Sequence, residues 1–223
     1  MAYSKDLLEK GAILQRDKET FAIAPHIPGG LTSPAQLRKI AAIAEKYNAK
    51  ALKLTSAQRI AIVGVDPDKL DDIWADLEMQ PGAALGLCVR SVKICPGTDF
   101  CKRAQQDGVQ LGLAIDKKYH GVSLPSKFKM GVSSCANSCA ESAVKDLGLV
   151  GTTKGFNIMV GGNAGVRPRL ANLIAEHVPA DEVMDLIAKI MEYYKSNAKP
   201  YERFGSTIDR LGLETVKTAI FEA

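Results

Sequence analysis

The chain of 223 residues is long enough for one large domain, or two small ones, with an apolar core. Its net charge of +4 is mild, gives no indication of nucleic-acid binding, and fits solubility as well as it fits an anionic substrate. No apolar run approaches the roughly 18 residues of a membrane span, and the first residues lack the apolar core of a signal peptide. We therefore expect a cytoplasmic protein with no membrane partner.

The first third of the chain alternates strand and helix patterns. Residues 21–24 predict a strand that ends at Pro25. Thr32 or Ser33 then caps a predicted helix that has Pro34 in its first turn. The apolar face of this helix, at helical spacing, is formed by Leu37, Ile40, Ala41, Ala44 and Tyr47.

Two further strands are expected over 52–54 and 60–63, followed by a helix that opens at Asp66-Pro67. The resulting order of strand, helix, two strands and helix is typical of a ferredoxin-like half-domain of the α+β class. Pro81-Gly82 marks the predicted boundary between domains 1–81 and 82–223.

The second part of the chain holds all five cysteines. A short helix is expected after Cys101, and a strand over 127–132 that leads into Cys135. A helix is then expected from Cys135 to about Asp146, and another strand over 156–160. The C-terminal region is expected to be helical up to Ile220, packing inward with Val183, Ile187, Ile190 and Met191.

Four cysteines form two pairs, C-x5-C and C-x3-C, separated by a long gap. In a reducing compartment such cysteines favour metal binding or redox chemistry over disulfides. The predicted helix would bring the second pair to one face, near its positive N-terminal end. We predict that one 4Fe-4S cluster is held by Cys95, Cys101, Cys135 and Cys139.

Two other interpretations of the cysteines remain open. A structural zinc site usually has two C-x2–4-C knuckles, which the five-residue gap between Cys95 and Cys101 fits poorly. The cysteines could also be unligated core residues. Cys88, in an apolar stretch, is expected to be a small buried residue rather than a fifth ligand.

The segments around these cysteines resemble the siroheme-containing sulfite and nitrite reductases. The likeness runs from about residue 27 to residue 173, and the paired cysteine spacings are its most specific part. It implies an α/β domain that binds siroheme and the 4Fe-4S cluster, with the Cys139 thiolate shared by both. The short length resembles the small single-module sulfite reductases of anaerobes. The matching segments are Cys95-Pro-Gly-Thr-Asp-Phe-Cys101, Cys135-Ala-Asn-Ser-Cys139, Asp146-Leu-Gly-Leu-Val-Gly151 and Gly161-Gly-Asn-Ala-Gly165.

Three basic residues are predicted to bind the substrate anion. Residues 124–129 resemble the family's lysine-bearing active-site strand, on which Lys127 and Lys129 leave the same face. Two converging ammonium groups favour an anion such as sulfite or nitrite, although a solvated edge strand is the alternative. Residues 54–59 resemble the family's L-T-x-R-Q segment. Ala57 replaces its usual arginine, and Arg59 lies two residues later, on the same face of a strand.

Siroheme carries eight carboxylates, so its binding site needs many hydrogen-bond donors, and arginine suits carboxylates best. For each single residue, surface charge is the alternative. The glycine-rich turn at 161–165 lacks the Lys-Ser/Thr of a phosphate loop. The predicted cofactor-binding residues are Arg167, Arg169, Asn137, Gln58, Arg103 and His26, with Lys102 a further candidate.

The resemblance implies an oxidoreductase that reduces sulfite to sulfide with six electrons, passed from the cluster to siroheme. Reduction of nitrite to ammonia at the same site is an alternative. No nicotinamide or flavin motif is visible, so a separate protein such as a ferredoxin is expected to supply electrons. Two other hypotheses are a siroheme-free electron carrier and a siroheme protein that barely turns over. The chain is expected to be a monomer or a homodimer.

Overall fold

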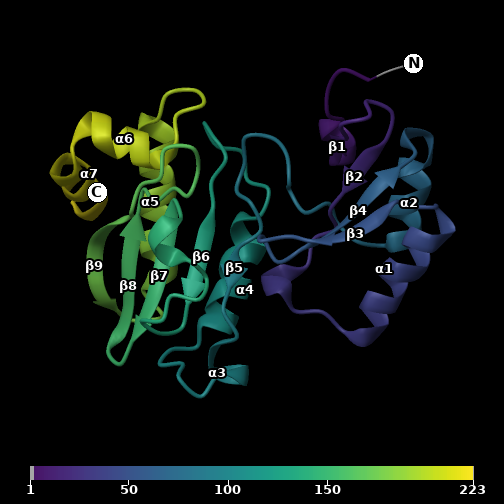
Figure 1. Cartoon of the computed structure of the whole chain (residues 1–223). Coiled ribbons are helices and arrows are strands. Elements are labelled where there is room, and N and C mark those ends of the chain that lie inside the picture. The colour runs from purple at the N-terminus through teal and green to yellow at the C-terminus, as the bar shows by residue number, and fades with distance from the viewer. Residues whose placement is uncertain (1–2, 223) are drawn as a thin grey trace. The chain divides into compact units, whose positions relative to one another are not determined.

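The computed structural model describes residues 3–222. The chain forms two compact units, Met1–Gly86 and Leu87–Ala223, each with its own apolar core (Figure 1). Pro81 and Gly82, at the predicted boundary, belong to the first unit, where the Gly82 N–H donates to the Ala24 carbonyl (2.8 Å). Within the described part of the chain, no helix combines the length and apolarity needed to cross a membrane.

The N-terminal unit is built on an antiparallel sheet with the strand order β1-β2-β4-β3. The predicted strands and both predicted helices are confirmed, while the short strand β1 was not predicted. The elements are η1 (Leu8–Lys10), β1 (Ala12–Leu14), β2 (Phe21–Ile23), η2 (Pro28–Gly30), α1 (Pro34–Lys46), β3 (Ala51–Leu54), β4 (Ile60–Val65), η3 (Pro67–Lys69) and α2 (Leu70–Leu77).

Local chemistry explains where the two helical segments begin. The Ser33 side chain accepts a hydrogen bond from the Gln36 N–H (3.1 Å) and caps α1. The Asp66 carboxylate caps η3 by accepting from the Asp68 N–H (2.9 Å). The predicted apolar face of α1 is wrong at Leu37, which is 43% exposed, because the buried face turns through Ile40, Ile43 and Ala44 instead.

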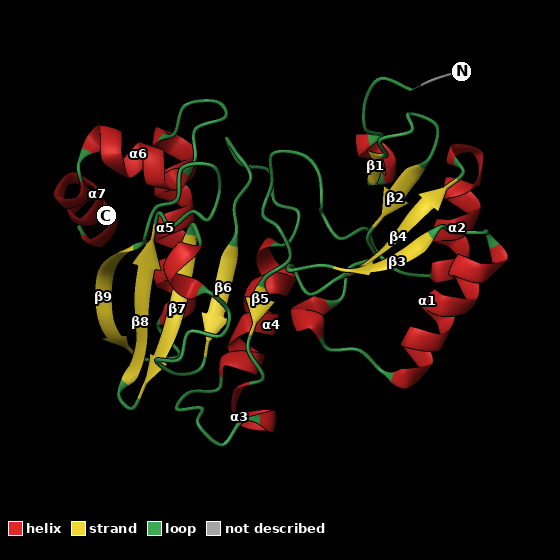
Figure 2. Ribbon diagram, viewed as in Figure 1, coloured by secondary structure: helices red, strands yellow, loops and turns green. Residues whose placement is uncertain are grey.

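The C-terminal unit is built on a mixed sheet with the strand order β5-β6-β7-β8-β9 (Figure 2). Strands β5, β6 and β7 run parallel, and β8 and β9 join antiparallel. Strands β5, β7 and β9 were not predicted. The strands are β5 (Lys93–Ile94), β6 (Met130–Ser133), β7 (Leu147–Thr152), β8 (Gly155–Val160) and β9 (Asn172–Val178).

The helices of this unit share one core with the sheet, which contains a tilted aromatic group of Phe128, Tyr194 and Phe204. The C-terminal helical region is confirmed, but Gly212, with a φ of 89°, divides its last part into two helices. The helices are α3 (Gly97–Phe100), α4 (Gly108–Tyr119), η4 (Ser142–Val144), α5 (Val183–Asn197), α6 (Phe204–Leu211) and α7 (Leu213–Phe221).

The helix predicted from Cys135 to Asp146 is wrong. Residues 134–141 form turns, and only η4 (Ser142–Val144) is helical before β7 begins. Ser138 and Glu141 both have left-handed backbone conformations, with φ of 51° and 57°, which interrupt a right-handed helix. The two cysteines of the second pair therefore lie on a looped backbone and not on one face of a helix.

Two other predicted elements are shifted. The strand expected over 127–132 begins only at Met130, and before it Phe128 makes an isolated bridge to Val89. The helix expected after Cys101 is α4, which begins at Gly108, and the short helix α3 before Cys101 was not predicted.

Candidate functional site

The first and third cysteines lie at one edge of the C-terminal sheet. Strands β5 and β6 are parallel, with Ile94 opposite Val132, so Cys95 and Cys135 both follow the carboxyl ends of neighbouring strands. The Cys95 N–H donates to the Val132 carbonyl (3.1 Å). The Cys95 sulfur accepts from the Ser134 N–H (3.1 Å), and its thiol lies 3.3 Å from Ser134 Oγ. The structure therefore places Cys95 beside the residue that precedes Cys135.

Cys101 lies on a loop whose two ends both contact Ser134. Its N–H donates to the Gly97 carbonyl (2.8 Å) at the end of α3, and its carbonyl accepts from the Ala104 N–H (3.1 Å). The next residue, Gln105, donates its N–H to the Ser134 carbonyl (2.8 Å). Because Cys95 also contacts Ser134, both ends of the loop that carries Cys101 are fixed at one point.

Cys139 lies on a second loop, which closes on Ser133 at the end of β6. The Ser138 N–H donates to the Cys135 carbonyl (3.1 Å), and the Ala140 N–H donates to Ser133 Oγ (3.0 Å). The Ser142 hydroxyl lies 2.9 Å from Ser133 Oγ and donates to the Leu149 carbonyl (2.8 Å). Cys139 itself is exposed.

The four cysteines thus lie on segments that are anchored to the adjacent Ser133 and Ser134. All five cysteines of the chain are free thiols. Among residues 3–222, no three Cys, His, Asp or Glu side chains lie close enough together to ligate one metal ion. An iron–sulfur cube distributes its thiolates over separate iron atoms, so it does not require that arrangement. Four free thiols on two anchored loops are a donor set that fits a cluster.

An ion-pair network lies beside the Cys139 loop and was missed in the sequence. The Glu141 carboxylate accepts from Lys93 Nζ (2.6 Å) on β5 and from Lys145 Nζ (2.9 Å) just before β7. These two ammonium groups lower the pKa of Glu141 to about 2, with Lys93 the larger cause. No local signal marks the pair between Lys93 and Glu141, which lie far apart in the sequence.

Lys127 and Lys129 flank the buried Phe128, and both are exposed. Partial burial of the ammonium group lowers the pKa of Lys129 from its ordinary value, and the nearby charges of Lys145, Arg203 and Lys127 lower it further. The Lys129 side chain therefore lies in a strongly cationic region. Such a region favours an anion, as the sequence predicts for these lysines.

A buried carboxylate, that of Asp146, holds the backbone of Lys129. Asp146, with no exposed surface, accepts the Lys129 backbone N–H (2.7 Å) and pairs with Arg203 through Nε (2.9 Å) and Nη2 (2.6 Å). Burial raises the pKa of Asp146 above its ordinary value, while the Arg203 guanidinium opposes that rise. Arg203 was not predicted as a site residue, although its partner Asp146 lies in a segment that resembles the family.

All hydrogen-bond donors of the Arg169 guanidinium are paired with other groups of the chain. Its five N–H groups donate to the Asp209 carboxylate, to Asn172 Oδ1, and to the carbonyls of Gly161 and Leu170. To bind a siroheme carboxylate, as predicted, Arg169 would have to release one of these partners. Its observed contacts hold the glycine-rich turn at 161–165 against α6.

The other predicted cofactor-binding residues of this unit lie at its surface. Arg167 is exposed, and its backbone carbonyl accepts from Asn163 Nδ2 (3.1 Å). Asn137 is exposed between Cys135 and Cys139, and Lys102 and Arg103 are exposed after Cys101. Asn137, Lys102 and Arg103 lie within two residues of a cysteine in the chain. The cofactor-binding roles of all four residues remain predictions.

Three predicted residues lie in the N-terminal unit. Arg59 is 8% exposed, and its guanidinium donates to the Gly82 carbonyl. Residues 55–59 form the turn between β3 and β4, so the expected strand geometry at Arg59 is wrong. Gln58 has a left-handed backbone (φ 58°) in that turn. The His26 N–H donates to the Gln80 carbonyl (2.7 Å).

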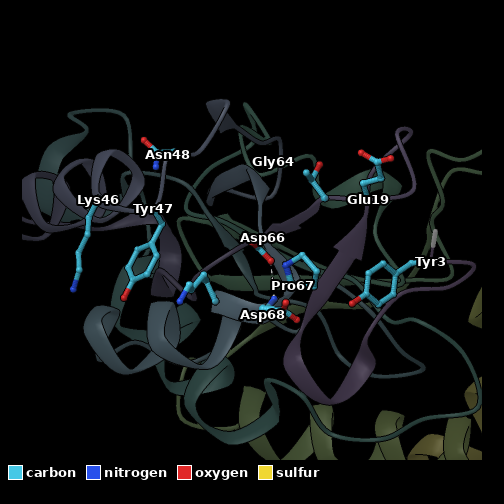
Figure 3. A pocket seen from close by; sticks show the side chains of 11 residues that line it. Tyr3, Glu19, Lys46, Tyr47, Asn48, Gly64, Asp66, Pro67 and Asp68 are labelled. Carbon is cyan, nitrogen blue, oxygen red and sulfur yellow. Dashed lines mark hydrogen bonds between the residues drawn. The ribbon is translucent and has the colours of Figure 1, made fainter. Parts of the chain in front are cut away.

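A cavity of about 750 Å³ also lies in the N-terminal unit, lined by Tyr3, Tyr47, Asp66, Asp68 and others (Figure 3). Its lining contains none of the predicted site residues. Lys46, which also lines the cavity, is paired with Asp76 (2.6 Å).

Comparison with known proteins identifies both units. Residues 85–223 match the nitrite and sulphite reductase 4Fe-4S domain, and residues 13–80 match the nitrite/sulfite reductase ferredoxin-like half domain. The chain is 41% identical over 211 residues to an assimilatory-type sulfite reductase of Nitratidesulfovibrio vulgaris, which covers 95% of this chain and 97% of that protein. These matches confirm the predicted ferredoxin-like half-domain and the α+β class.

Two further relatives extend the comparison. The chain is 39% identical to an NAD(P)H nitrite reductase of Bacillus subtilis over 94% of its own length, which is only 26% of that protein. The crystal structure of dissimilatory sulfite reductase I matches with a TM-score of 0.82 and 16% identity, over 90% of this chain and 68% of that one, and so supports the fold alone. From the matches to both of its domains and to a full-length relative, we conclude that this chain belongs to the nitrite and sulfite reductase family with a 4Fe-4S domain.

Proposed function

We propose that this protein is a sulfite reductase that converts sulfite to sulfide with six electrons. The observation that carries the proposal is the 41% identity to an assimilatory-type sulfite reductase over 97% of that protein's length. The match covers nearly the whole of both chains, so the likeness is not limited to a single module.

Cys95, Cys101, Cys135 and Cys139 are the proposed ligands of the 4Fe-4S cluster, and Cys139 is the thiolate shared with siroheme. The anchoring of both cysteine loops to Ser133 and Ser134 supports this assignment. The two cofactors, when bound, supply the electron storage and the open iron site that sulfite reduction needs. Arg167, Asn137, Arg103, Gln58 and His26 are proposed donors to siroheme carboxylates.

Lys127, Lys129 and Arg59 are the proposed substrate-binding residues. Their positive charges would orient the sulfite oxygens, and the two lysine ammonium groups would supply protons as each oxygen leaves as water. The lowered pKa of Lys129 supports the second role, because an ammonium group with a lowered pKa gives up its proton more readily. The buried Asp146 carboxylate holds the Lys129 backbone in place and is therefore a positioning group.

The wider setting of the reaction is also proposed. A separate protein such as a ferredoxin supplies the electrons, and the chain works in the cytoplasm, where its five free cysteines remain reduced. It acts as a monomer or a homodimer. The two functional domains are residues 1–81 and 82–223.

Nitrite reduction to ammonia is the second candidate. It is favoured by the 39% identity to an NAD(P)H nitrite reductase over 94% of this chain. The same cationic residues suit either anion, so substrate assays must decide between the two.

The test uses protein purified without oxygen. Iron, sulfide and siroheme contents are measured, together with the visible spectrum, and the reduction of sulfite and of nitrite by reduced methyl viologen is then compared. Five irons per chain, four in the cluster and one in siroheme, are expected, with faster turnover of sulfite than of nitrite. A cluster without siroheme bands would point to an electron carrier, and faster turnover of nitrite would favour the second candidate.

A further inference from the structure

One ion pair joins the two cysteine-bearing segments of the C-terminal unit. Lys93 lies two residues before Cys95, and Glu141 lies two residues after Cys139. Lys93 Nζ and the Glu141 carboxylate are 2.6 Å apart. The first segment belongs to β5, and the second is the loop that replaces the predicted helix. The first and last proposed cluster ligands are therefore tied to each other through side chains.

The surroundings of this pair are closely packed. The Lys93 and Lys145 side chains are only 15% and 10% exposed, and both contact the Glu141 carboxylate. Between them lies Gly131 of β6, which pairs with Lys93 in the sheet. A Cβ atom at Gly131 would lie 2.9 Å from the Ala140 carbonyl and 3.0 Å from Lys145 Cγ. The Glu141 loop and the Lys145 side chain thus lie directly on the backbone of β6.

The backbone of Glu141 also depends on local contacts. It has a left-handed conformation (φ 57°), which costs free energy for a residue other than glycine. Its N–H donates to the Ser138 carbonyl (2.7 Å). Favourable interactions elsewhere must offset that cost, and the Glu141 side chain makes two charge-assisted hydrogen bonds.

We propose that Glu141, held between Lys93 and Lys145, is a positioning residue that keeps the Cys139 loop docked beside Cys95. The ion network arranges the cysteine site in the protein chain itself and slows loss of a bound cluster. If Glu141 is replaced by a neutral residue, two largely buried ammonium groups are left without their shared counter-charge. Their repulsion releases the loop from β6. The inference rests on the proposed cluster ligation by the four cysteines.

The experiment compares Glu141→Gln, Lys93→Met and wild type as full-length protein purified without oxygen. The first readout is the rate at which a ferrous chelator removes iron from the loaded protein. The second is amide hydrogen exchange of residues 134–141 by mass spectrometry. Both variants are expected to lose iron and to exchange in this loop roughly fivefold faster than wild type, the effect of about 1 kcal/mol in local opening. Glu214→Gln, which breaks an exposed pair with Lys217 on α7, is the matched control and should leave both rates unchanged.

Each outcome decides something. Wild-type rates of iron release and loop exchange in both variants overturn the inference while leaving the cluster proposal intact. If wild type binds no iron, the cluster proposal fails, and loop exchange in the same protein still tests whether Glu141 fixes the loop. If Glu141→Gln does not fold, as judged by circular dichroism, Lys93→Met decides, because it breaks the same pair from the β5 side.

Discussion

Asp146 and Arg203 form a two-point ion pair in the C-terminal unit. Arg203 Nε lies 2.9 Å from Asp146 Oδ1, and Nη2 lies 2.6 Å from Oδ2. The carboxylate is fully buried and also accepts the backbone N–H of Lys129 (2.7 Å). One buried charge therefore joins the segment that carries the proposed substrate lysine to the start of α6.

The first prediction concerns the removal of that charge. Asp146→Asn should lower the free energy of unfolding by about 3–5 kcal/mol, because Arg203 is left partly buried without its counter-charge. Urea unfolding measures the effect. Asp209→Asn, which removes the exposed partner of Arg169, is the control and should cost less than about 1 kcal/mol. Equal losses of unfolding free energy in the two variants would mean that the buried Asp146 pair stabilises the fold no more than the exposed Asp209 pair.

The second prediction separates the four proposed cluster ligands from the remaining cysteine. Serine at Cys95, Cys101, Cys135 or Cys139 should remove most of the bound iron and sulfide, because a hydroxyl is a much weaker iron ligand than a thiolate. Cys88→Ser should retain both. Iron and sulfide analysis of protein purified without oxygen gives the answer. Full iron content in two or more of the four variants would contradict the assignment.

The third prediction concerns the substrate lysines. Lys129→Met and Lys127→Met should raise KM for sulfite by roughly 10- to 100-fold, the loss of one charge-assisted hydrogen bond of about 1.5–3 kcal/mol. Steady-state assays with reduced methyl viologen measure KM and kcat separately. Lys117→Met, on the exposed side of α4, is the control. An unchanged KM in both site variants would place the anion elsewhere.

The fourth prediction follows from the lowered pKa of Lys129. Its ammonium group loses its proton at a lower pH than an ordinary lysine, whose pKa is about 10.4. In wild type, kcat/KM for sulfite should therefore fall, as pH rises, before that value is reached. Lys129→Arg keeps its charge to higher pH and should move the fall upward. A pH profile that is identical in the two proteins would show that another group controls it.

Helices with a clear apolar periodicity were predictable from the sequence. In α1, α2 and α5 the apolar residues recur at helical spacing because they pack on the sheet of their own unit, as at Ile40, Ile73 and Ile190. Among the strands that were not predicted, β7 and β9 depend instead on pairing with β8, and the exposed residues of β9 hide any alternation. A strand that is stabilised mainly by pairing with another strand has no strong signal in its own residues.

The cysteine site shows the same limit. The cysteine spacing was readable, since ligand chemistry restricts it, but the i to i+4 spacing of Cys135 and Cys139 also predicts a helix. The structure has left-handed residues at Ser138 and Glu141 instead. These conformations are stabilised by hydrogen bonds to Ser133 and by Lys93, and no local sequence rule contains those contacts.

Arg169 makes a contact that the sequence does not reveal. Its place after a glycine-rich turn and the resemblance to the family both favoured cofactor binding. In the structure the guanidinium is paired with Asp209, on α6, forty residues further along the chain. Only the folded chain shows that this arginine already has a partner.

The last prediction concerns the ion pair between Glu202 and Arg210. Glu202, just before Arg203, pairs with Arg210 Nε (2.8 Å) and Nη2 (2.7 Å), and this pair is the main cause that lowers the pKa of Glu202 to about 2. In the unfolded chain the pKa of glutamate is about 4.3. The pair therefore stabilises the fold fully above about pH 4.3, and the stabilisation is lost as pH falls through about 2.

Glu202→Gln should accordingly lower the midpoint of thermal unfolding by about 2–4 °C at pH 7. The difference from wild type should shrink between about pH 4 and pH 2. Circular dichroism at several pH values measures it, with Glu214→Gln as the exposed-pair control. Glu202 also accepts hydrogen bonds from the Lys199 N–H (2.9 Å) and the Thr207 hydroxyl (3.2 Å). A difference that stays constant down to pH 2 would mean that the substitution acts by weakening these hydrogen bonds and not by removing the charge.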